Sequence, residues 1–239
     1  MLLKPGLKFV LFSEVHGTEE SPELFGDAVC SVLRSGRKVV VAIEWPRENQ
    51  GLIEDYLASE GGAEAKIILL SSPAWRDQTS GKSSQAMLKL IDRLRALRAE
   101  GLDLKVTTFF GVMLPGDTGQ TEVNARMAKH LIDAGARSPG ALVMALTGFA
   151  HGARSTPASS FLSMATAMPH SRTVTLGLRG WGGEAWPCRS SGIPALCLRT
   201  GAEEIPRGIG LLHGPSAQFD GYYSVGKPLR SSPPAAPAD

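Results

Sequence analysis

Short, uninterrupted apolar runs alternate along the chain with longer segments in which apolar residues recur every three or four positions. Runs of the first kind are typical of strands buried on both faces, and segments of the second kind are typical of amphipathic helices. Strands are predicted at residues 9–12, 39–43, 104–109, 140–147, 173–178 and 219–225, with shorter strand-like pieces at 195–199 and 209–212. Helices are predicted at residues 22–35, 52–59, 85–100 and 121–134, and a further helix is predicted to begin at Pro157. This order predicts an α/β fold with a mainly parallel sheet flanked by helices.

The same pattern indicates one domain followed by a short tail. Residues 1–228 carry the alternating elements without an internal repeat, so they are interpreted as a single domain. Residues 229–239 are rich in Ser, Pro and Ala, and this composition predicts a disordered tail.

Composition excludes several classes of partner. The 25 basic residues of this 239-residue chain are interspersed with 23 acidic ones, which does not favour a nucleic-acid partner. Three cysteines without the spacing of a zinc site or disulfide framework indicate a reducing compartment. No apolar run approaches the roughly 18 residues of a membrane span, and no signal-peptide pattern is visible. We therefore expect a cytoplasmic protein with no membrane partner.

Chemically capable side chains follow three of the predicted strands. Glu14 and His16 come directly after the first strand, and Gly17 permits a sharp turn or a close backbone approach. Glu44 ends the second strand, and His151 follows the strand at 140–147. Because parallel strands joined by right-handed crossovers have their carboxyl ends at one edge, we expect these side chains to lie together. Ligands bind at that edge in open α/β sheets.

Two histidines and two carboxylates support two different mechanisms of hydrolysis. His16, His151 and one of Glu14 or Glu44 give the ligand count of a catalytic metal site, with donors that suit Mn, Fe, Co, Ni or Zn. Alternatively, one histidine oriented by a glutamate acts as a general base on water without any metal. The chain contains neither a G-x-S-x-G elbow nor an H-E-x-x-H motif, which argues against a serine hydrolase of the α/β type and against a zincin.

A long polar segment, residues 71–84, is interpreted as a lid or binding loop that flanks the site. It contains Gly81-Lys82-Ser83, which matches the end of a phosphate-binding P-loop. That motif requires a glycine where Arg76 stands, and no strand precedes the loop. We therefore reject a P-loop here.

Taken together, the motifs resemble those of the EreA/ChaN-like superfamily, which includes erythromycin esterases, ChaN haem-uptake lipoproteins, TraB/PrgY proteins and Tiki metalloproteases. The similar features are Glu-x-His-Gly-Thr at 14–18, Glu44 at the end of strand two, Arg126 beside Met127, Gly-x-x-His at 148–151 and Phe-Asp-Gly-Tyr-Tyr at 219–223. The resemblance spans roughly residues 8–226. It departs at Ser13, where the family usually has glycine.

The resemblance implies a hydrolase that acts on an ester, amide or lactone-like bond of a small-molecule or peptide substrate. The site residues that it implies are Glu14, His16, Glu44, Arg126 and His151, with a divalent metal on His16, His151, Glu14 and Glu44 if the metal-dependent branch is followed. Two alternatives remain open. One is a ChaN-type protein that binds haem or another ligand, and the other is a pathway enzyme that uses the same site for a non-hydrolytic cyclisation or elimination.

Overall fold

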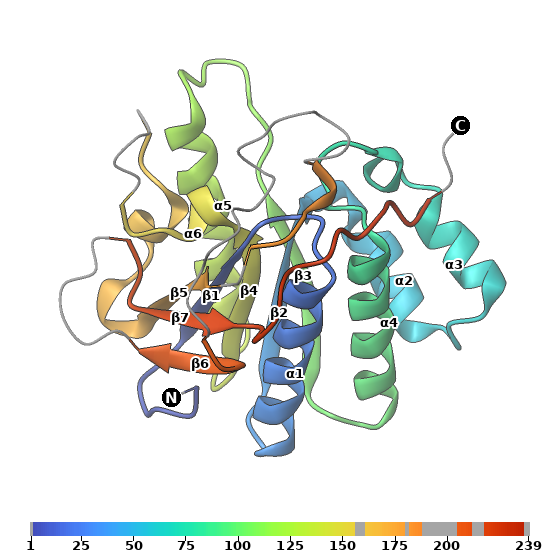
Figure 1. The fold of residues 1–239 in the computed structure, drawn as a ribbon, viewed down its shortest axis with the longest axis horizontal. Helices are drawn as coiled ribbons and strands as arrows, with labels where there is room; N and C mark the ends of the chain where they lie inside the picture. The colour runs from blue at the N-terminus through green and yellow to red at the C-terminus, as the bar shows by residue number, and fades with distance from the viewer. Residues whose placement is uncertain (1, 156–160, 180–181, 188–204, 212–217, 237–239) are drawn as a thin grey trace.

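The apolar runs of the sequence form a single twisted sheet with helices on both faces (Figure 1). The computed structural model of the protein describes residues 2–155, 161–179, 182–187, 205–211 and 218–236. Within these ranges the strands are β1 (Phe9–Glu14), β2 (Val39–Pro46), β3 (Leu104–Phe110), β4 (Leu142–Gly148), β5 (Thr173–Arg179), β6 (Gly208–Leu211) and β7 (Gly221–Ser224). The predicted α/β fold with a mainly parallel sheet is confirmed.

The strand order is β3-β2-β4-β1-β5-β7-β6, and only β6 runs antiparallel to its neighbour in the described sheet. β4 therefore lies between β1 and β2, although it follows both by about a hundred residues in the chain. The three strands that carry the candidate chemistry are thus consecutive in the sheet. Their carboxyl ends meet at one edge.

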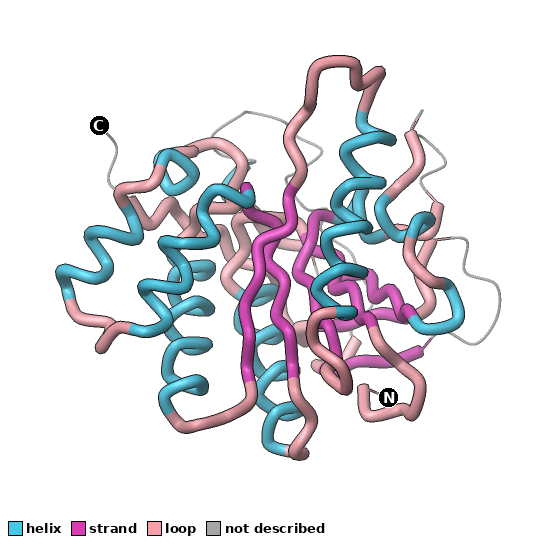
Figure 2. Tube along the Cα trace, turned by 180° about the vertical axis from the view of Figure 1, so that it is seen from behind, coloured by secondary structure: helices cyan, strands magenta, loops and turns pink. Residues whose placement is uncertain are grey.

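Two layers of helices cover the sheet. The helices are α1 (Glu20–Arg34), α2 (Gln50–Ala58), α3 (Ala63–Leu70), α4 (Gln85–Ala99), α5 (Gln120–Ala136) and the single turn α6 (Phe149–Gly152). Because side chains alternate along a strand, Val10 and Phe12 of β1 pack in the core formed with α1, α2 and α4. Phe9 and Leu11 pack in the second core, formed with α5. Figure 2 shows the sheet from this second side.

Some predicted elements are displaced or lie outside the described residues. Residues 156–160, where a helix was expected to begin at Pro157, and the strand-like piece at 195–199 are not described. The described residues between β4 and β5 form a single helical turn, Phe149–Gly152, and two short 3₁₀ turns, Met164–Ala167 and His170–Arg172. No helix in the described part of the chain is long and apolar enough to cross a membrane.

Residues 229–236, hereafter the C-terminal segment, differ from the disordered tail that composition predicts. The segment runs in extended form past the starts of α1 and α4 (Figure 1). The Ser232 amide donates to the Gly17 carbonyl at 2.8 Å, and the Glu19 amide donates to the Arg230 carbonyl at 2.9 Å. Three further bonds join the segment to the start of α4: from Gln85 N to Pro233 O at 2.8 Å, from Ala235 N to Ser83 O at 2.8 Å and from Ala86 N to Ser232 Oγ at 3.0 Å.

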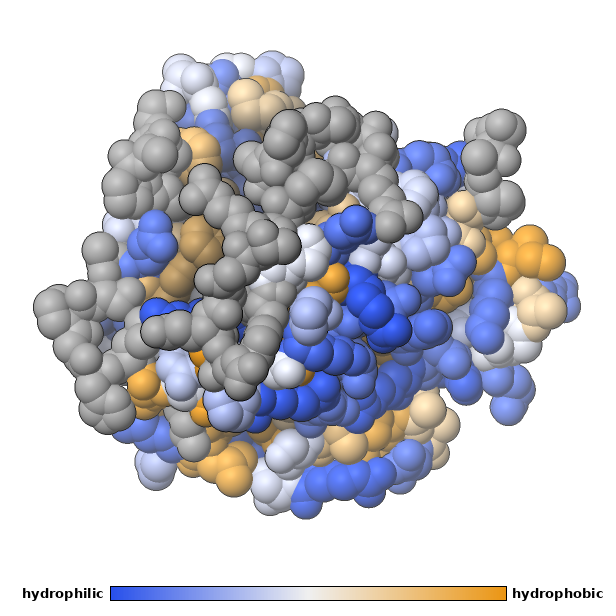
Figure 3. Space-filling model, in the orientation of Figure 1, coloured by the Kyte–Doolittle hydropathy of each residue, from blue (hydrophilic) through white to orange (hydrophobic). Residues whose placement is uncertain are grey.

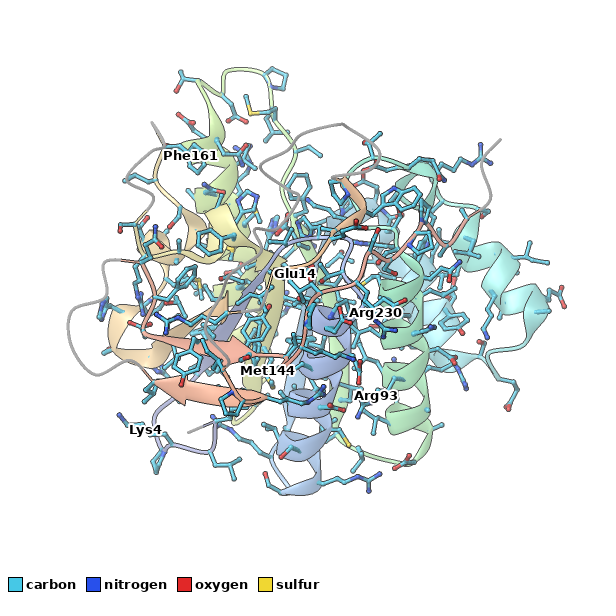
Figure 4. The ribbon with its side chains drawn as sticks, in the orientation of Figure 1. Lys4, Glu14, Arg93, Met144, Phe161 and Arg230 are labelled. Atoms are coloured by element: carbon cyan, nitrogen blue, oxygen red, sulfur yellow. The ribbon has the colours of Figure 1, made fainter. Side chains whose placement is uncertain are left out.

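Charge pairing adds to these backbone contacts. The buried Glu20 carboxylate accepts a hydrogen bond from the Arg230 amide at 2.9 Å and another from its guanidinium Nε at 3.0 Å. Figure 4 labels Arg230 beside the upper part of α1, and Figure 3 shows hydrophilic residues gathered over this face. Composition predicted disorder because the segment carries few apolar residues. It is ordered because open amides and carbonyls at two helix starts supply its partners.

We predict that a chain ending at Pro228 unfolds with a free energy lower by about 2–4 kcal/mol, because at least five hydrogen bonds worth about 1 kcal/mol each are lost and part of the ordering entropy is regained. Urea denaturation followed by circular dichroism measures this difference. A chain that lacks only residues 237–239 is the control, since it keeps every described contact of the segment. Equal midpoints for the two truncations would contradict the assigned role of residues 229–236.

Candidate active site

The carboxyl ends of β1, β4 and β2 bring Glu14, His16, Glu44 and His151 into one cluster. Gly148 at the end of β4 lies opposite Glu14 of β1. A Cβ atom on Gly148 would lie 3.0 Å from His16 Nε2, 3.5 Å from His151 Cδ2 and 3.7 Å from Glu44 Oε2. The cluster thus closes around a glycine whose missing side chain leaves the space in which the two imidazoles approach each other. Figure 4 labels Glu14 in the middle of the molecule.

Glu44 is a buried carboxylate with partners on both oxygens. Its Oε2 accepts hydrogen bonds from the Thr147 hydroxyl and from the Gly148 amide, both at 2.6 Å. Its Oε1 lies 2.5 Å from Lys82 Nζ. Burial by itself would raise the pKa of Glu44, but the Lys82 charge and the contact with His16 outweigh burial and hold this pKa well below its ordinary value. Glu44 is therefore a fixed negative charge rather than a proton acceptor.

His16 is held between two carboxylates. Its Nδ1 lies 2.8 Å from Glu14 Oε1, and its Nε2 lies 3.6 Å from Glu44 Oε1. Burial alone would lower the pKa of His16, but the hydrogen bond with Glu14 and the Glu44 charge raise it to about 9. Burial raises the pKa of Glu14, and its hydrogen bond to His16 opposes this. The pair shares a proton, which we place on His16 because two carboxylates face its ring.

His151 has a different environment. Its Nδ1 lies 2.7 Å from Asn124 Oδ1, while Asn124 Nδ2 donates to the Leu162 carbonyl at 2.7 Å. Because the Leu162 carbonyl can only accept a hydrogen bond, the Asn124 atom that faces it must be the NH₂ nitrogen. The Asn124 Oδ1 therefore faces His151 and accepts from it. Burial lowers the pKa of His151, with the Glu44 charge opposing and Lys82 reinforcing the shift. His151 is thus neutral at pH 7, protonated on Nδ1, with the lone pair of Nε2 in the cluster.

Lys82, like Asn124, is a site residue that sequence reasoning missed. It follows Gly81, whose positive φ of 77° matches the 78° of Gly17. A Cβ on Gly81 would lie 2.7 Å from the Gly17 Cα atom, so the two loops touch backbone to backbone. This contact carries the end of segment 71–84 to the site, as the lid or binding-loop interpretation expected. The rejected P-loop match contained the right lysine, but no sequence signal indicated its carboxylate partner.

Arg126, which the resemblance implied as a site residue, points elsewhere in the structure. Its guanidinium pairs with Asp117 at 2.5 Å and donates to the Val112 carbonyl at 2.8 Å. These contacts hold the loop between β3 and α5, and no contact with the two histidines or two glutamates is seen among the described residues. The helix that carries Arg126 contributes Asn124 to the site instead. A role for Arg126 in the chemistry stays a prediction.

The arrangement of the cluster does not favour a metal ion. A divalent ion would have to bind Glu44 Oε1 together with the two imidazole Nε2 atoms. The Lys82 ammonium group already lies 2.5 Å from that oxygen, so the lysine occupies the position that a metal ion would need. Across the described residues, no group of three or more His, Cys, Asp and Glu side chains is arranged to hold a metal ion. The donor set as it stands does not fit a divalent metal.

No protein-family model and no curated protein sequence matches this chain. Solved structures do match it. An erythromycin esterase mutant in its open conformation has a TM-score of 0.67 at 10% identity, with 98% of this chain and 93% of that chain covered. A succinoglycan biosynthesis protein has a TM-score of 0.64 at 10% identity, covering 96% of this chain and 90% of that chain. A Bacillus cereus protein has a TM-score of 0.59 at 10% identity, with 97% of this chain and 91% of that chain covered. The fold that the resemblance implied is therefore shared with an erythromycin esterase, and at 10% identity these likenesses show the fold alone.

The two histidines should lose their protons at well-separated pH values. We predict that nuclear magnetic resonance of the imidazole rings shows His16 losing its proton near pH 9, while His151 is already neutral at pH 7. Replacing Glu14 with Gln keeps the shape of the side chain and removes its charge, so the pKa of His16 should fall toward its ordinary value. A wild-type His16 that loses its proton near neutral pH would refute this assignment.

Proposed function

We propose that the protein is a hydrolase that cleaves an ester, amide or lactone-like bond by general base catalysis. The observation that supports this most is the fixed tautomer of His151, which presents a neutral Nε2 beside the cationic groups of His16 and Lys82. A base poised next to positive charge is the arrangement that addition of water to a carbonyl requires. The fold shared with an erythromycin esterase is consistent with hydrolysis.

Each group then has a separate role in the reaction. His151 Nε2 takes a proton from water as the water oxygen bonds to the carbonyl carbon, and the carbonyl electron pair moves onto its oxygen. The His16 imidazolium and the Lys82 ammonium stabilise that oxyanion. When the tetrahedral intermediate collapses, His151 returns the proton to the leaving oxygen or nitrogen. Asn124 holds the His151 ring in the productive tautomer throughout.

Glu44 positions both cations without taking the proton itself. Its charge keeps Lys82 in place and raises the pKa of His16, and its other oxygen is anchored on β4 by two hydrogen bonds. Glu14 fixes the His16 ring from the other side. This division explains why a site with two glutamates uses neither as the base.

The alternatives are less well supported by the geometry. Haem binding requires a free axial ligand, and His16, whose two ring nitrogens both face carboxylates, does not supply one. Tyr223, a further candidate ligand, is fully buried and donates to the Ser13 carbonyl at 3.1 Å. A cyclisation or elimination would use the same base and cations on another substrate. We retain a small-molecule or peptide substrate, and a cytoplasmic location, as parts of the proposal.

The first test is a panel of carboxylic esters, lactones and amides assayed with and without a chelator. We expect hydrolysis that survives chelation, because Lys82 and His16 replace the Lewis acid. His151→Gln should lower kcat by about 10²–10⁴-fold, the contribution of a general base. His170→Gln removes an exposed histidine and should leave the rate unchanged. Loss of wild-type activity on chelation, or full activity in His151→Gln, would overturn the mechanism.

The second test is the pH dependence of kcat/KM. Activity should rise with pH as His151 loses its proton on the acidic side, since burial lowers its pKa, and should fall as His16 loses its proton near pH 9. Glu44→Gln should cost about a hundredfold or more and shift the alkaline limb to lower pH, because His16 loses a flanking charge. If activity falls at the same alkaline pH in this variant as in the wild type, the group that loses its proton there is not His16, and its role as a cation in the reaction is wrong.

A further inference from the structure

A pocket of about 490 Å³ lies next to Lys82. This volume falls within the range of roughly 300–1,000 Å³ typical of small-molecule sites. The apolar part of its lining consists of Trp45, Pro46, Pro73, Ala74 and Phe110. The polar cluster described above uses none of these five side chains.

The pocket shares its inner wall with the polar cluster. Lys82 Nζ lies 4.2 Å from the centre of the Phe110 ring and 2.5 Å from Glu44 Oε1. The Phe110 ring also packs edge to face with the His151 ring, with centroids 6.5 Å apart. A group seated in the pocket therefore lies one side chain away from the proposed base and cations.

The aromatic wall is fixed before any ligand arrives. The Trp45 indole N–H donates to the Lys82 carbonyl at 3.2 Å, which ties the wall to the loop that carries the lysine. Trp45 also packs edge to face on Trp75 with centroids 4.3 Å apart, and both indoles are buried. A preformed wall of this kind favours a flat, rigid ligand group, since little ordering entropy is lost on binding.

The polar groups of the lining are largely engaged with the protein itself. Asp77 Oδ1 accepts the Thr79 and Ser80 amides at 2.9 and 3.2 Å, and Asn49 Oδ1 accepts the Ser72 hydroxyl at 2.5 Å. The pocket thus offers mainly apolar contact, with the Lys82 ammonium group at its inner end.

We propose that this pocket binds an aromatic or alicyclic ring of the substrate, so that the substrate is an ester, amide or lactone with an uncharged ring close to the carbonyl. This inference rests on the proposed function and adds its substrate class. Trp45 and Phe110 contact the ring, and Lys82 faces the oxygen of the reacting carbonyl.

The test compares methyl acetate with methyl 2-naphthylacetate and 2-naphthylmethyl acetate, which place a ring on either side of the carbonyl. Proton release at constant pH gives kcat/KM for each. At least one ring-bearing ester should exceed methyl acetate by about tenfold or more, the gain expected from burying a large apolar group. Ala74→Trp, which fills the pocket, should abolish that preference. Ala58→Trp adds the same indole on the exposed end of α2 and should change neither the preference nor the rate with methyl acetate.

Calorimetric titration with 2-naphthylacetamide separates the two proposals, because binding needs no turnover. Binding to the wild type that is lost in Ala74→Trp supports the pocket even if no ester is hydrolysed, in which case the proposed function alone fails. Hydrolysis without any preference for a ring, together with no binding of the amide, overturns the pocket and leaves the hydrolase proposal standing. If Ala74→Trp melts well below the wild type, the smaller Ala74→Leu is used. It should weaken the ring preference and the binding of the amide in the same direction, by a smaller factor.

Discussion

Burying a carboxylate at the end of a central strand costs free energy unless its charge is compensated. Glu44, at the end of β2, is such a buried carboxylate. The compensation comes from three places: the lysine of the loop before α4, the amide and hydroxyl at the end of β4, and the His16 imidazolium that follows β1. Removing the charge would leave Lys82 without its partner and His16 with one carboxylate fewer. The placement of every cation in the site therefore depends on this one group.

Two histidines at the same sheet edge differ because their Nδ1 partners differ. A carboxylate accepts from His16 and favours its charged form, whereas an amide oxygen accepts from His151 and supplies no charge to stabilise a second cation. Burial then decides the protonation state of His151, and the nearby Lys82 acts in the same direction. Groups whose environments move their pKa values apart can act as a base and a fixed cation in one reaction.

Gly17 connects the site to distant parts of the chain. Its carbonyl accepts the amides of Trp186 and Ser232 at 2.9 and 2.8 Å, and its Cα atom lies against Gly81. Substitution of either glycine would strain a left-handed backbone, and the added Cβ atom would also push apart the loops that carry Gly17 and Gly81. The C-terminal segment also bonds to residues 83–86, so the loop that carries Lys82 is held from both sides. Order in this segment and the position of the lysine are thereby linked.

The sequence by itself determined the fold class and the convergence of Glu14, His16, Glu44 and His151, because apolar runs report buried strands and parallel strands place their ends at one edge. It did not determine that β4 inserts between β1 and β2, since strand order depends on pairings between residues about a hundred positions apart. Lys82 and Asn124 come from a loop and a helix whose approach is set by packing, so their spacing to the motifs carries no signal. The C-terminal segment is ordered by partners that its composition does not reveal. Local pattern predicted most of the elements, but not α3 (Ala63–Leu70). Only long-range contacts decided which side chains pair their charges and hold the protons.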